Sequence, residues 1–418
     1  MVEKVKRNIQ GWVYELLEAF PAVEITGARQ VGKSTLAADV ARSLGRKAQI
    51  YTLDNPEARL VAESDPRSFL AQNPEGVMVI DEVQRVPSLL LPLKAAIDAH
   101  RAPGRFILTG SAKITAGAGS ADSLAGRVVG VEMMGFSQGE LAGVKEDFVA
   151  RVVSGAINPS VEKSSLTRGN YVDLIVTGSM PEAQGLSRRT REAWFGSYIE
   201  RITSRDILDL ARVTQGSAVV SFLRQVAALQ GSEAVVGRMA SQANLTAVTA
   251  QSYAHLLESL YLVQRLTPWT PNLLKREVGK PKMLMNDSGI GVWLTRTRPE
   301  TLKDPMQGQA LGGFLESFVA SELLRQRSWS EEEWDLKHYR SPDGREIDIV
   351  IELTDERVIA LEVKAAATVQ PQDSRHLGWL REKLGDRFVA GIVLTTDTQG
   401  RLLGDRLCSL PVASLWGT

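Results

Sequence analysis

The stretch GARQVGKST, residues 27–35, follows a short apolar run and precedes a segment of good helix formers. A glycine loop between a strand and a helix lets backbone N–H groups point inward at phosphate oxygens, and the helix N-terminus favours an anion. We expect Lys33 to reach the β- and γ-phosphates of ATP and the Ser34 hydroxyl to contact Mg²⁺. The candidate nucleotide-binding residues are Gly27, Ala28, Arg29, Gln30, Val31, Gly32, Lys33, Ser34 and Thr35.

A second apolar run, residues 77–80, ends in two acids, Asp81 and Glu82. A continuous apolar run is typical of a strand that is buried on both faces. Asp81 at its carboxyl end is placed to hold Mg²⁺, and Glu82 is the natural base or water-orienting group for hydrolysis. In isolation, two acids after an apolar run also fit a capped helix start. After a phosphate-binding loop, hydrolysis by water is the favoured interpretation.

The composition of the chain argues against several classes of function. With 418 residues, the chain is expected to form two to four domains. Its 49 basic and 49 acidic residues balance, so net charge neither favours nor disfavours nucleic acid. One cysteine and four scattered histidines exclude a disulfide framework within the chain and make a Cys/His metal site improbable. Without a secretory leader or an apolar stretch of about 20 residues, we expect a cytoplasmic location and no membrane partner.

Polar side chains also follow a third apolar run, residues 105–108. Strands that alternate with helices predict an α/β fold with a parallel sheet, in which ligands bind beyond the carboxyl ends of the strands. Thr109 and Ser111 are therefore expected beside Asp81, where a hydroxyl can position the attacking water. An ordinary strand-to-turn transition is the alternative.

Residues 112–130 are rich in Gly, Ala and Ser and predict a loop that ends in LAGR. Arg127 is a candidate arginine finger, which stabilises charge on a transferring phosphoryl group. It would act within one chain or from a neighbouring subunit of a homo-oligomer. A surface arginine without such a role is the alternative.

Three helical patterns and a short strand between residues 217 and 270 predict a winged helix-turn-helix. Its recognition helix would be the third, and DNA is the expected partner, in a branched or duplex form that the pattern does not specify. That helix is not basic. Phosphate neutralisation would have to come from nearby cations, namely Arg238, Arg265, Lys275, Arg276, Lys280 and Lys282. A winged helix used only for packing or oligomerisation is the alternative.

The last region, residues 286–418, carries a second constellation. Strand alternation puts Glu362 and Lys364 on one face, and Asp348 on a neighbouring strand can join them. Asp348 and Glu362 could hold a second Mg²⁺ for phosphodiester hydrolysis, Lys364 could stabilise the transition state, and Glu316 from a helix could complete the set. A chance grouping of charges, or a set that is present but catalytically idle, are the alternatives.

Taken together, GARQVGKST, VMVIDEVQ, FILTGSA and LAGR resemble a prokaryotic AAA+-type ATPase family whose members carry a C-terminal domain of unassigned function. That domain resembles PD-(D/E)xK nucleases through Glu316, GREIDIVIE and LEVKAA. The resemblance covers nearly the whole chain, GSMPEA and YIERITSRDI included, and implies ATPase roles for Lys33, Ser34, Asp81 and Glu82. No separate Pro-Asp pair precedes the catalytic aspartate, because Pro342-Asp343 lies in the turn before Asp348.

The predicted architecture is an AAA+-type P-loop ATPase core (1–145), a helical linker or lid (146–212), a winged helix-turn-helix (213–285) and an α/β restriction-endonuclease-like domain (286–418). The leading hypothesis is an ATP hydrolase, with ATP and Mg²⁺ as cofactors, that binds or remodels DNA. A nucleotide-controlled switch or scaffold that binds protein partners, with an inactive nuclease-like domain, is the alternative. A third hypothesis adds strand cleavage.

Overall fold

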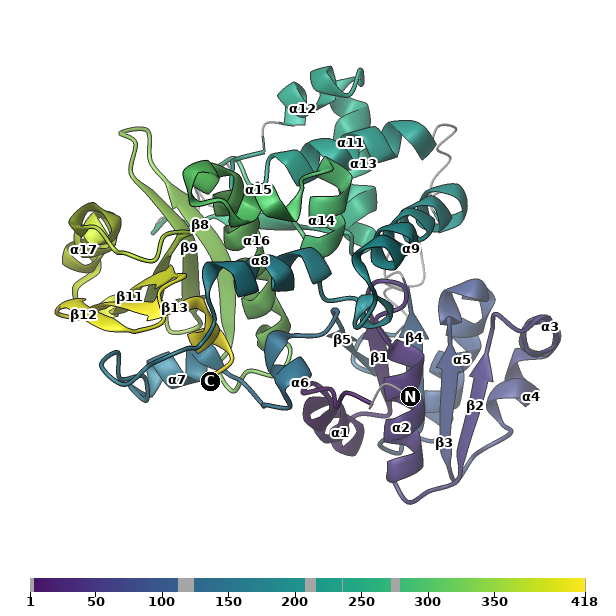
Figure 1. The fold of residues 1–418 in the computed structure, drawn as a ribbon. Helices are drawn as coiled ribbons and strands as arrows, with labels where there is room; N and C mark the ends of the chain where they lie inside the picture. Colours follow the sequence, from purple (N-terminus) through teal and green to yellow (C-terminus); the bar gives the residue numbers. More distant parts are fainter. Residues whose placement is uncertain (1–3, 112–123, 207–215, 235, 272–278, 418) are drawn as a thin grey trace. The chain divides into compact units, whose positions relative to one another are not determined.

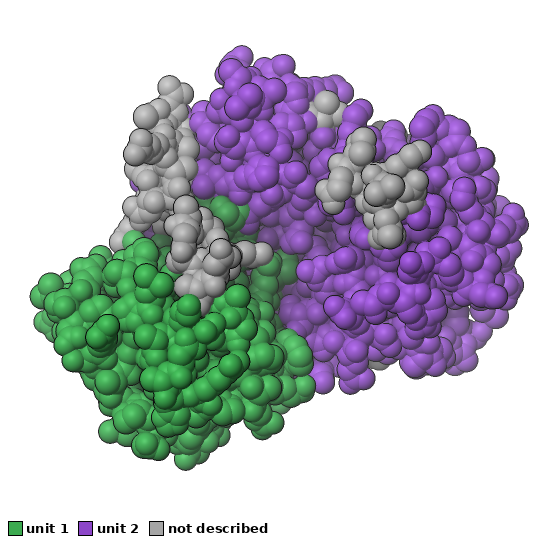
Figure 2. Space-filling view, turned by 180° about the vertical axis from the view of Figure 1, so that it is seen from behind, with its two compact units in different colours: residues 1–136, 259–261 green, residues 137–258, 262–418 purple. Residues whose placement is uncertain are grey.

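A computed structural model describes residues 4–111, 124–206, 216–234, 236–271 and 279–417. The chain divides into two compact units (Figure 2). Unit 1 comprises Met1–Phe136 and Ser259–Tyr261, and unit 2 comprises Ser137–Glu258 and Leu262–Thr418. Unit 1 corresponds to the ATPase core expected from the sequence, and unit 2 contains the regions assigned above to the linker, the winged helix and the nuclease-like domain.

Unit 1 is built on a five-stranded sheet in the order β2-β3-β4-β1-β5, in which all neighbouring strands are parallel (Figure 1). This confirms the predicted α/β fold with a parallel sheet. Its strands are β1 (Ala22–Thr26), β2 (Ala48–Thr52), β3 (Val77–Asp81), β4 (Phe106–Gly110) and β5 (Val128–Glu132). Its helices are α1 (Gln10–Ala19), α2 (Lys33–Ser43), α3 (Pro56–Ser64), α4 (Pro66–Leu70) and α5 (Leu90–Ala99).

The core of unit 1 explains why the polar strand ends meet. The central strands β1 and β4 are buried along their whole length, and Met78, Ile80 and Phe106 pack with Phe69 and Leu93. Burial of these apolar side chains fixes the register of the sheet. In that register Ile80 lies opposite Leu108, so Asp81 and Thr109 follow at the same carboxyl edge.

Strand β5 corrects one expectation. The sequence analysis extended a loop to residue 130, but the chain is a strand from Val128 onward and pairs with β1. A glycine at 130 and the small residues before it hid the strand pattern. Residues 112–123 of that expected loop lie outside the described residues.

Unit 2 contains an eight-stranded sheet in the order β12-β13-β11-β10-β9-β8-β6-β7. The strands are β6 (Val263–Pro268), β7 (Lys282–Met285), β8 (Trp334–Arg340), β9 (Glu346–Leu353), β10 (Val358–Lys364), β11 (Phe388–Thr395), β12 (Arg401–Gly404) and β13 (Leu407–Pro411). The antiparallel hairpin β6–β7 joins this sheet because β6 pairs with β8. The sequence analysis placed the hairpin and the C-terminal strands in separate domains, whereas here they share one sheet.

Unit 2 also contains helices, most of which are labelled in Figure 1. They are α6 (Gln138–Ala142), α7 (Phe148–Val153), α8 (Arg168–Thr177), α9 (Arg188–Arg201), α11 (Gly216–Ala228), α12 (Val236–Gln242), α13 (Ala247–Ser259), α14 (Ser288–Thr295), α15 (Pro299–Lys303), α16 (Gly308–Arg327) and α17 (Arg375–Leu384). Helices α11, α12 and α13 followed by β6–β7 have the element order that a winged helix requires. The winged helix itself stays a prediction.

Candidate functional site

The loop between β1 and α2 has the backbone that a phosphate cradle needs. Gly27, Gln30 and Gly32 have positive φ angles of 148°, 62° and 97°. A Cβ on Gly27 would come within 2.0 Å of the carbonyl oxygen of Met133, so only glycine fits there. Gly32 is the N-cap of α2, whose first N–H groups have no partner within the helix. The loop can therefore bind an anion through its backbone.

Lys33 is buried beside this loop. Its Nζ donates hydrogen bonds to the carbonyl oxygens of Gly27 (3.0 Å) and Ala28 (2.7 Å), and 4% of the residue is exposed. Burial lowers the pKa of Lys33 to about 8, although the charges of Glu82 and Asp81 act in the opposite direction. A phosphate group would supply the negative charge that compensates this burial.

Three oxygen-bearing side chains converge where α2, β3 and β4 meet. The Ser34 hydroxyl donates a 2.5 Å hydrogen bond to Oδ1 of Asp81, and the Thr109 hydroxyl donates to the same oxygen. A serine hydroxyl and an aspartate are hard oxygen ligands of the kind Mg²⁺ takes alongside nucleotide phosphates. The donor set thus fits a Mg²⁺ ion, and Ser34 and Asp81 would hold it.

Glu82 lies next to Asp81 in a strained backbone conformation, with φ at 57°. Its N–H donates to the Thr109 hydroxyl at 3.2 Å, and its Oε2 accepts a hydrogen bond from the Ser111 hydroxyl at 3.2 Å. The structure therefore brings together Asp81, Glu82, Thr109 and Ser111, as expected from the carboxyl ends of neighbouring strands.

Gln84 completes this group, and sequence reasoning did not include it. Its Nε2 donates to Ser111 Oγ at 3.0 Å and also to Oε2 of Glu82. The short turn Val83–Arg85 brings the side chain back toward the acid two residues earlier. The available signal was the glutamine itself, which stands two residues after Glu82 in DEVQ.

Arg7 was also missed. Its guanidinium donates to the carbonyl oxygens of Val31 in the loop (3.3 Å) and Met134 (2.6 Å). It is 7% exposed and supports the glycine loop from within unit 1. A lone arginine near the start of the chain carries no sequence pattern that points to this contact.

Arg127 lies at the amino ends of the strands, whereas the glycine loop lies at their carboxyl ends. It directly precedes β5, and Val128 pairs with Ala22 at the start of β1, whereas the loop follows the end of β1. Its guanidinium makes a two-point ion pair with Asp98, with N–O distances of 2.7 and 3.0 Å. The structure thus contradicts an arginine finger acting within one chain. A finger supplied to a neighbouring chain stays a prediction.

In unit 2, the structure brings together the four residues of the second constellation. Glu316 comes from α16, Asp348 from β9, and Glu362 and Lys364 from β10. Lys364 Nζ lies 2.9 Å from Glu362 Oε2 and 3.9 Å from Asp348 Oδ2. The N–H of Val363 donates to Asp348 Oδ2 at 2.9 Å.

An unexpected lysine lies in this cluster. Lys282, the first residue of β7, is fully buried, and its Nζ lies 2.6 Å from Glu316 Oε1, 3.3 Å from Glu346 Oε1 and 4.0 Å from Asp348 Oδ1. The sequence analysis named Lys282 as a candidate contact to DNA phosphates. That interpretation was wrong, because a side chain without exposed surface cannot reach a phosphate.

Two acids in this cluster, Glu316 and Glu362, have raised pKa values. Burial raises the pKa of Glu316 to about 8, with a further contribution from the charge of Asp348. Burial and Asp348 likewise raise the pKa of Glu362. Over the described ranges, no group of three or more His, Cys, Asp or Glu residues is arranged to hold a metal ion. Lys282 and Lys364 both lie within 4.0 Å of Asp348, so ammonium groups of the chain already surround the acid that the second Mg²⁺ would need.

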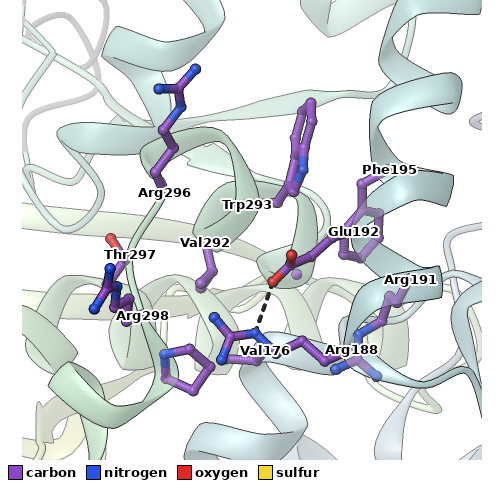
Figure 3. Close-up of a pocket in the computed structure, with 12 residues that line it drawn as sticks. Val176, Arg188, Arg191, Glu192, Phe195, Val292, Trp293, Arg296, Thr297 and Arg298 are labelled. Carbon is purple, nitrogen blue, oxygen red and sulfur yellow. Dashed lines mark hydrogen bonds and ion pairs between the residues drawn. The ribbon is translucent and has the colours of Figure 1, made fainter.

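Unit 2 also has a cavity of about 340 Å³ between α9 and the segment that follows α14 (Figure 3). Figure 3 shows Arg188 and Arg191 on the α9 side and Arg298 on the other side. Arg188 pairs with Glu192 at 2.9 Å and also with Glu300 at 3.2 Å. Arginines outnumber the single acid in the lining, so the cavity chemically suits an anionic group.

Comparison with protein families agrees with the geometry of unit 1. The model of a family described as "AAA domain" matches residues 19–142, which include the glycine loop and all five strands of its sheet. This match supports an AAA-type P-loop ATPase domain. Two families described as domains of unknown function, DUF8612 and DUF4143, match residues 168–301 and 311–415.

Two mycobacterial proteins are similar to nearly the whole chain. The uncharacterized proteins Rv2008c of Mycobacterium tuberculosis and Mb2031c of Mycobacterium bovis are each 27% identical over 419 residues, which is 99% of this chain and 85% of theirs. Among solved structures, the Walker-type ATPase paby2304 of Pyrococcus abyssi matches with a TM-score of 0.42 and 13% identity, over 70% of this chain and 96% of that one.

Across the described part of the chain, no helix is both long and apolar enough to cross a membrane.

Proposed function

We propose that this protein is a Mg²⁺-dependent ATP hydrolase whose active site is the carboxyl edge of the sheet in unit 1. The observation that carries the proposal is the hydrogen bond between Ser34, which opens α2, and Asp81, which ends β3. It puts a hydroxyl and a carboxylate next to the glycine loop, which is where nucleotide phosphates and their metal ion would lie.

The proposed role of each residue follows from its position in the site. The loop N–H groups and Lys33 bind the phosphates, and Ser34 and Asp81 hold the metal ion. When bound, Mg²⁺ would neutralise charge on the transferring phosphoryl group. Glu82 accepts a proton from, or orients, the attacking water, and Ser111 and Gln84 hold its carboxylate in position through hydrogen bonds.

Paired measurements of ATP binding and ATP turnover test this assignment. Lys33→Ala should weaken ATP binding and abolish turnover, because the phosphates lose their buried counter-charge. Lys47→Ala, an exposed lysine in the same unit, is the matched control and should behave like the wild type. Unchanged turnover in Lys33→Ala would refute the proposed site.

The target of the ATP cycle is a separate question, and the geometry favours the switch or scaffold over DNA binding. Of the cations expected to neutralise DNA phosphates, Lys282 is buried and Arg265 pairs with Glu258 at 2.7 Å. Lys275 and Arg276 lie outside the described residues. Arg238 and Lys280 are exposed. Of the four described cations, only two are therefore available for the phosphate contacts that dominate DNA affinity. We infer that unit 2 binds protein partners under nucleotide control.

DNA binding remains directly testable. ATP turnover should be the same without DNA and with single-stranded, duplex or branched DNA, and a fluorescent duplex should not bind at low salt. Stimulation by any one form, lost in Gln251→Ala on α13, would restore the DNA-remodelling hypothesis. Ala substitution of Gln264 on the adjacent hairpin is the control.

A further inference from the structure

The cluster of acids in unit 2 already contains a cation that belongs to the chain. Lys282 has no exposed surface, and its ammonium group lies within 4.0 Å of three carboxylates, those of Glu316, Glu346 and Asp348. A buried ammonium group is tolerated only where carboxylates compensate its charge and hydrogen-bonding capacity. Its position is therefore set by these acids, two of which the sequence pattern assigns to a nuclease-like set.

Asp348, the residue that a divalent ion would need, is held between two ammonium groups. Its Oδ1 faces Lys282 at 4.0 Å. Its Oδ2 faces Lys364 at 3.9 Å and accepts the N–H of Val363 at 2.9 Å. Both carboxylate oxygens thus already have partners that carry positive charge or donate a proton.

The position of the Lys282 ammonium group is fixed by its partner and by its strand. Its main partner, Glu316, is fixed on α16 and backed by Gly231, where an added Cβ would lie 2.9 Å from Glu316 Oε2. Lys282 also begins β7, which is paired along its length with β6. A divalent ion placed at Asp348 would face the buried Lys282 and the partly exposed Lys364, each within 4.0 Å of Asp348. Repulsion from the buried ammonium group is the stronger, because water screens it little.

We propose that Lys282 takes the place of a divalent metal ion in this cluster, so that unit 2 holds its nuclease-like acids together with a built-in ammonium group. The cluster then acts as an electrostatic cross-link between elements of unit 2. It fastens the β6–β7 hairpin to β9 and α16 next to the β6–β8 pairing, because Lys282 pairs with Leu266 and β6 pairs with β8 from Thr267 onward. This inference does not depend on ATP hydrolysis in unit 1.

Metal binding by the full-length protein without nucleotide tests the proposal. The probe is Mn²⁺, followed by the electron paramagnetic resonance signal of the free ion, and every protein carries Asp81→Asn so that unit 1 adds no site. In this background, the protein with Lys282 present should bind no Mn²⁺ that is sensitive to Asp348→Asn. Mn²⁺ binding that is lost on Asp348→Asn while Lys282 is present would overturn the proposal.

Lys282→Met provides the complementary arm, because methionine has a similar shape without the charge. If this variant folds, as checked by circular dichroism, it should bind Mn²⁺ at least tenfold more tightly than its parent, and Asp348→Asn should remove that gain. A folded Lys282→Met protein without the gain would contradict the exchange of metal for ammonium. If the Lys282→Met variant does not fold, the proposal is tested by Mn²⁺ binding to the parent and to its Asp348→Asn variant alone.

A cleavage assay adds a second readout. The wild type should not nick plasmid DNA with Mg²⁺ or Mn²⁺ in a manner that Asp348→Asn or Glu362→Gln abolishes. Nicking that disappears in both variants would overturn the proposal, since it would require a metal ion at these acids.

Discussion

The hydroxyl of Ser34, at the start of α2, donates a 2.5 Å hydrogen bond to Oδ1 of Asp81, at the end of β3. The two residues are far apart in the sequence and meet because β1 and β3 run parallel in one sheet. Ser34 and Asp81 are the residues that would hold a Mg²⁺ ion, which would supply positive charge next to nucleotide phosphates.

Asp81→Asn should therefore uncouple ATP binding from turnover. The amide keeps the shape but removes the charge that attracts the metal ion, so we expect turnover to fall at least about 100-fold while metal-free ATP binding persists. The measurement is phosphate release against Mg²⁺ concentration. Asp54→Asn, an acid that follows β2 and pairs with Arg85, is the control. Equal loss in both variants would argue against a specific role for Asp81.

Gln84→Ala should lower turnover without changing ATP affinity. Gln84 contacts Glu82 and Ser111, so it positions the acid that acts on water. Loss of one positioning hydrogen bond is expected to cost about 1–2 kcal/mol, or roughly tenfold in rate. Gln72→Ala, which removes a contact to Tyr51 elsewhere in unit 1, should leave the rate unchanged. A change in ATP affinity alone would contradict this role for Gln84.

The pH dependence of ATP affinity should report on Lys33. Its pKa is about 8 in the free protein because the group is buried, and bound phosphate raises that pKa. Protonated Lys33 binds phosphate more tightly, so affinity is full below about pH 8 and falls above it, by up to about tenfold per pH unit. Titration of a fluorescent ATP analogue measures this. Lys33→Met should bind weakly at all pH values, and a flat profile in the wild type would contradict the assignment.

Strand ends were the most predictable part of the site. Short apolar runs identified β1, β3 and β4, and in a parallel sheet their polar ends must meet at one edge. That logic predicted that Asp81, Glu82, Thr109 and Ser111 lie together, as they do in the structure. Gln84 was missed because its position depends on the tight turn after β3 and not on a strand end.

Lys282 shows where sequence reasoning fails. Its partner Glu316 lies 34 residues away, and Glu346 and Asp348 are farther still. In sequence, Lys282 stands among Lys280 and other polar residues and so predicts a solvated, basic surface. Only the pairing of β7 within the hairpin, and the packing of α16, bring it to the acids. The sequence likewise did not show that Arg127 lies away from the glycine loop of its own chain, since the strand that it precedes was hidden in a small-residue stretch.

Loss of the Lys282 charge should destabilise unit 2. Removing one partner of a buried ion pair leaves uncompensated acids and typically costs about 3–5 kcal/mol. We expect Lys282→Ala to lower the free energy of unfolding by that amount, measured by urea denaturation. Lys280→Ala, an exposed neighbour, should change it by less than about 0.5 kcal/mol. Similar effects of both substitutions would show that the cluster is not the cause.

A buried acid in unit 2 should make its stability depend on pH. Burial raises the pKa of Glu146 to about 7, from an ordinary value of 4.5. Because the folded pKa is raised, this contribution to stability is full below about pH 4.5 and is lost as pH rises toward 7, at up to about 1.4 kcal/mol per pH unit. Glu146→Gln should flatten that slope in thermal unfolding, and exposed Glu331→Gln should not. An unchanged slope in Glu146→Gln would show that other acids cause the pH dependence of stability.

The most direct test of the central claim compares wild type with Glu82→Gln for ATP binding and Mg²⁺-dependent ATP hydrolysis in the same preparation. The account predicts hydrolysis by the wild type and equally tight ATP binding in both proteins. It also predicts that turnover in Glu82→Gln falls by about 100-fold or more, because the amide cannot act on the water. Exposed Glu63→Gln should match the wild type. Undiminished turnover in Glu82→Gln, or no hydrolysis by a wild type that binds ATP and Mg²⁺, would contradict the proposed function.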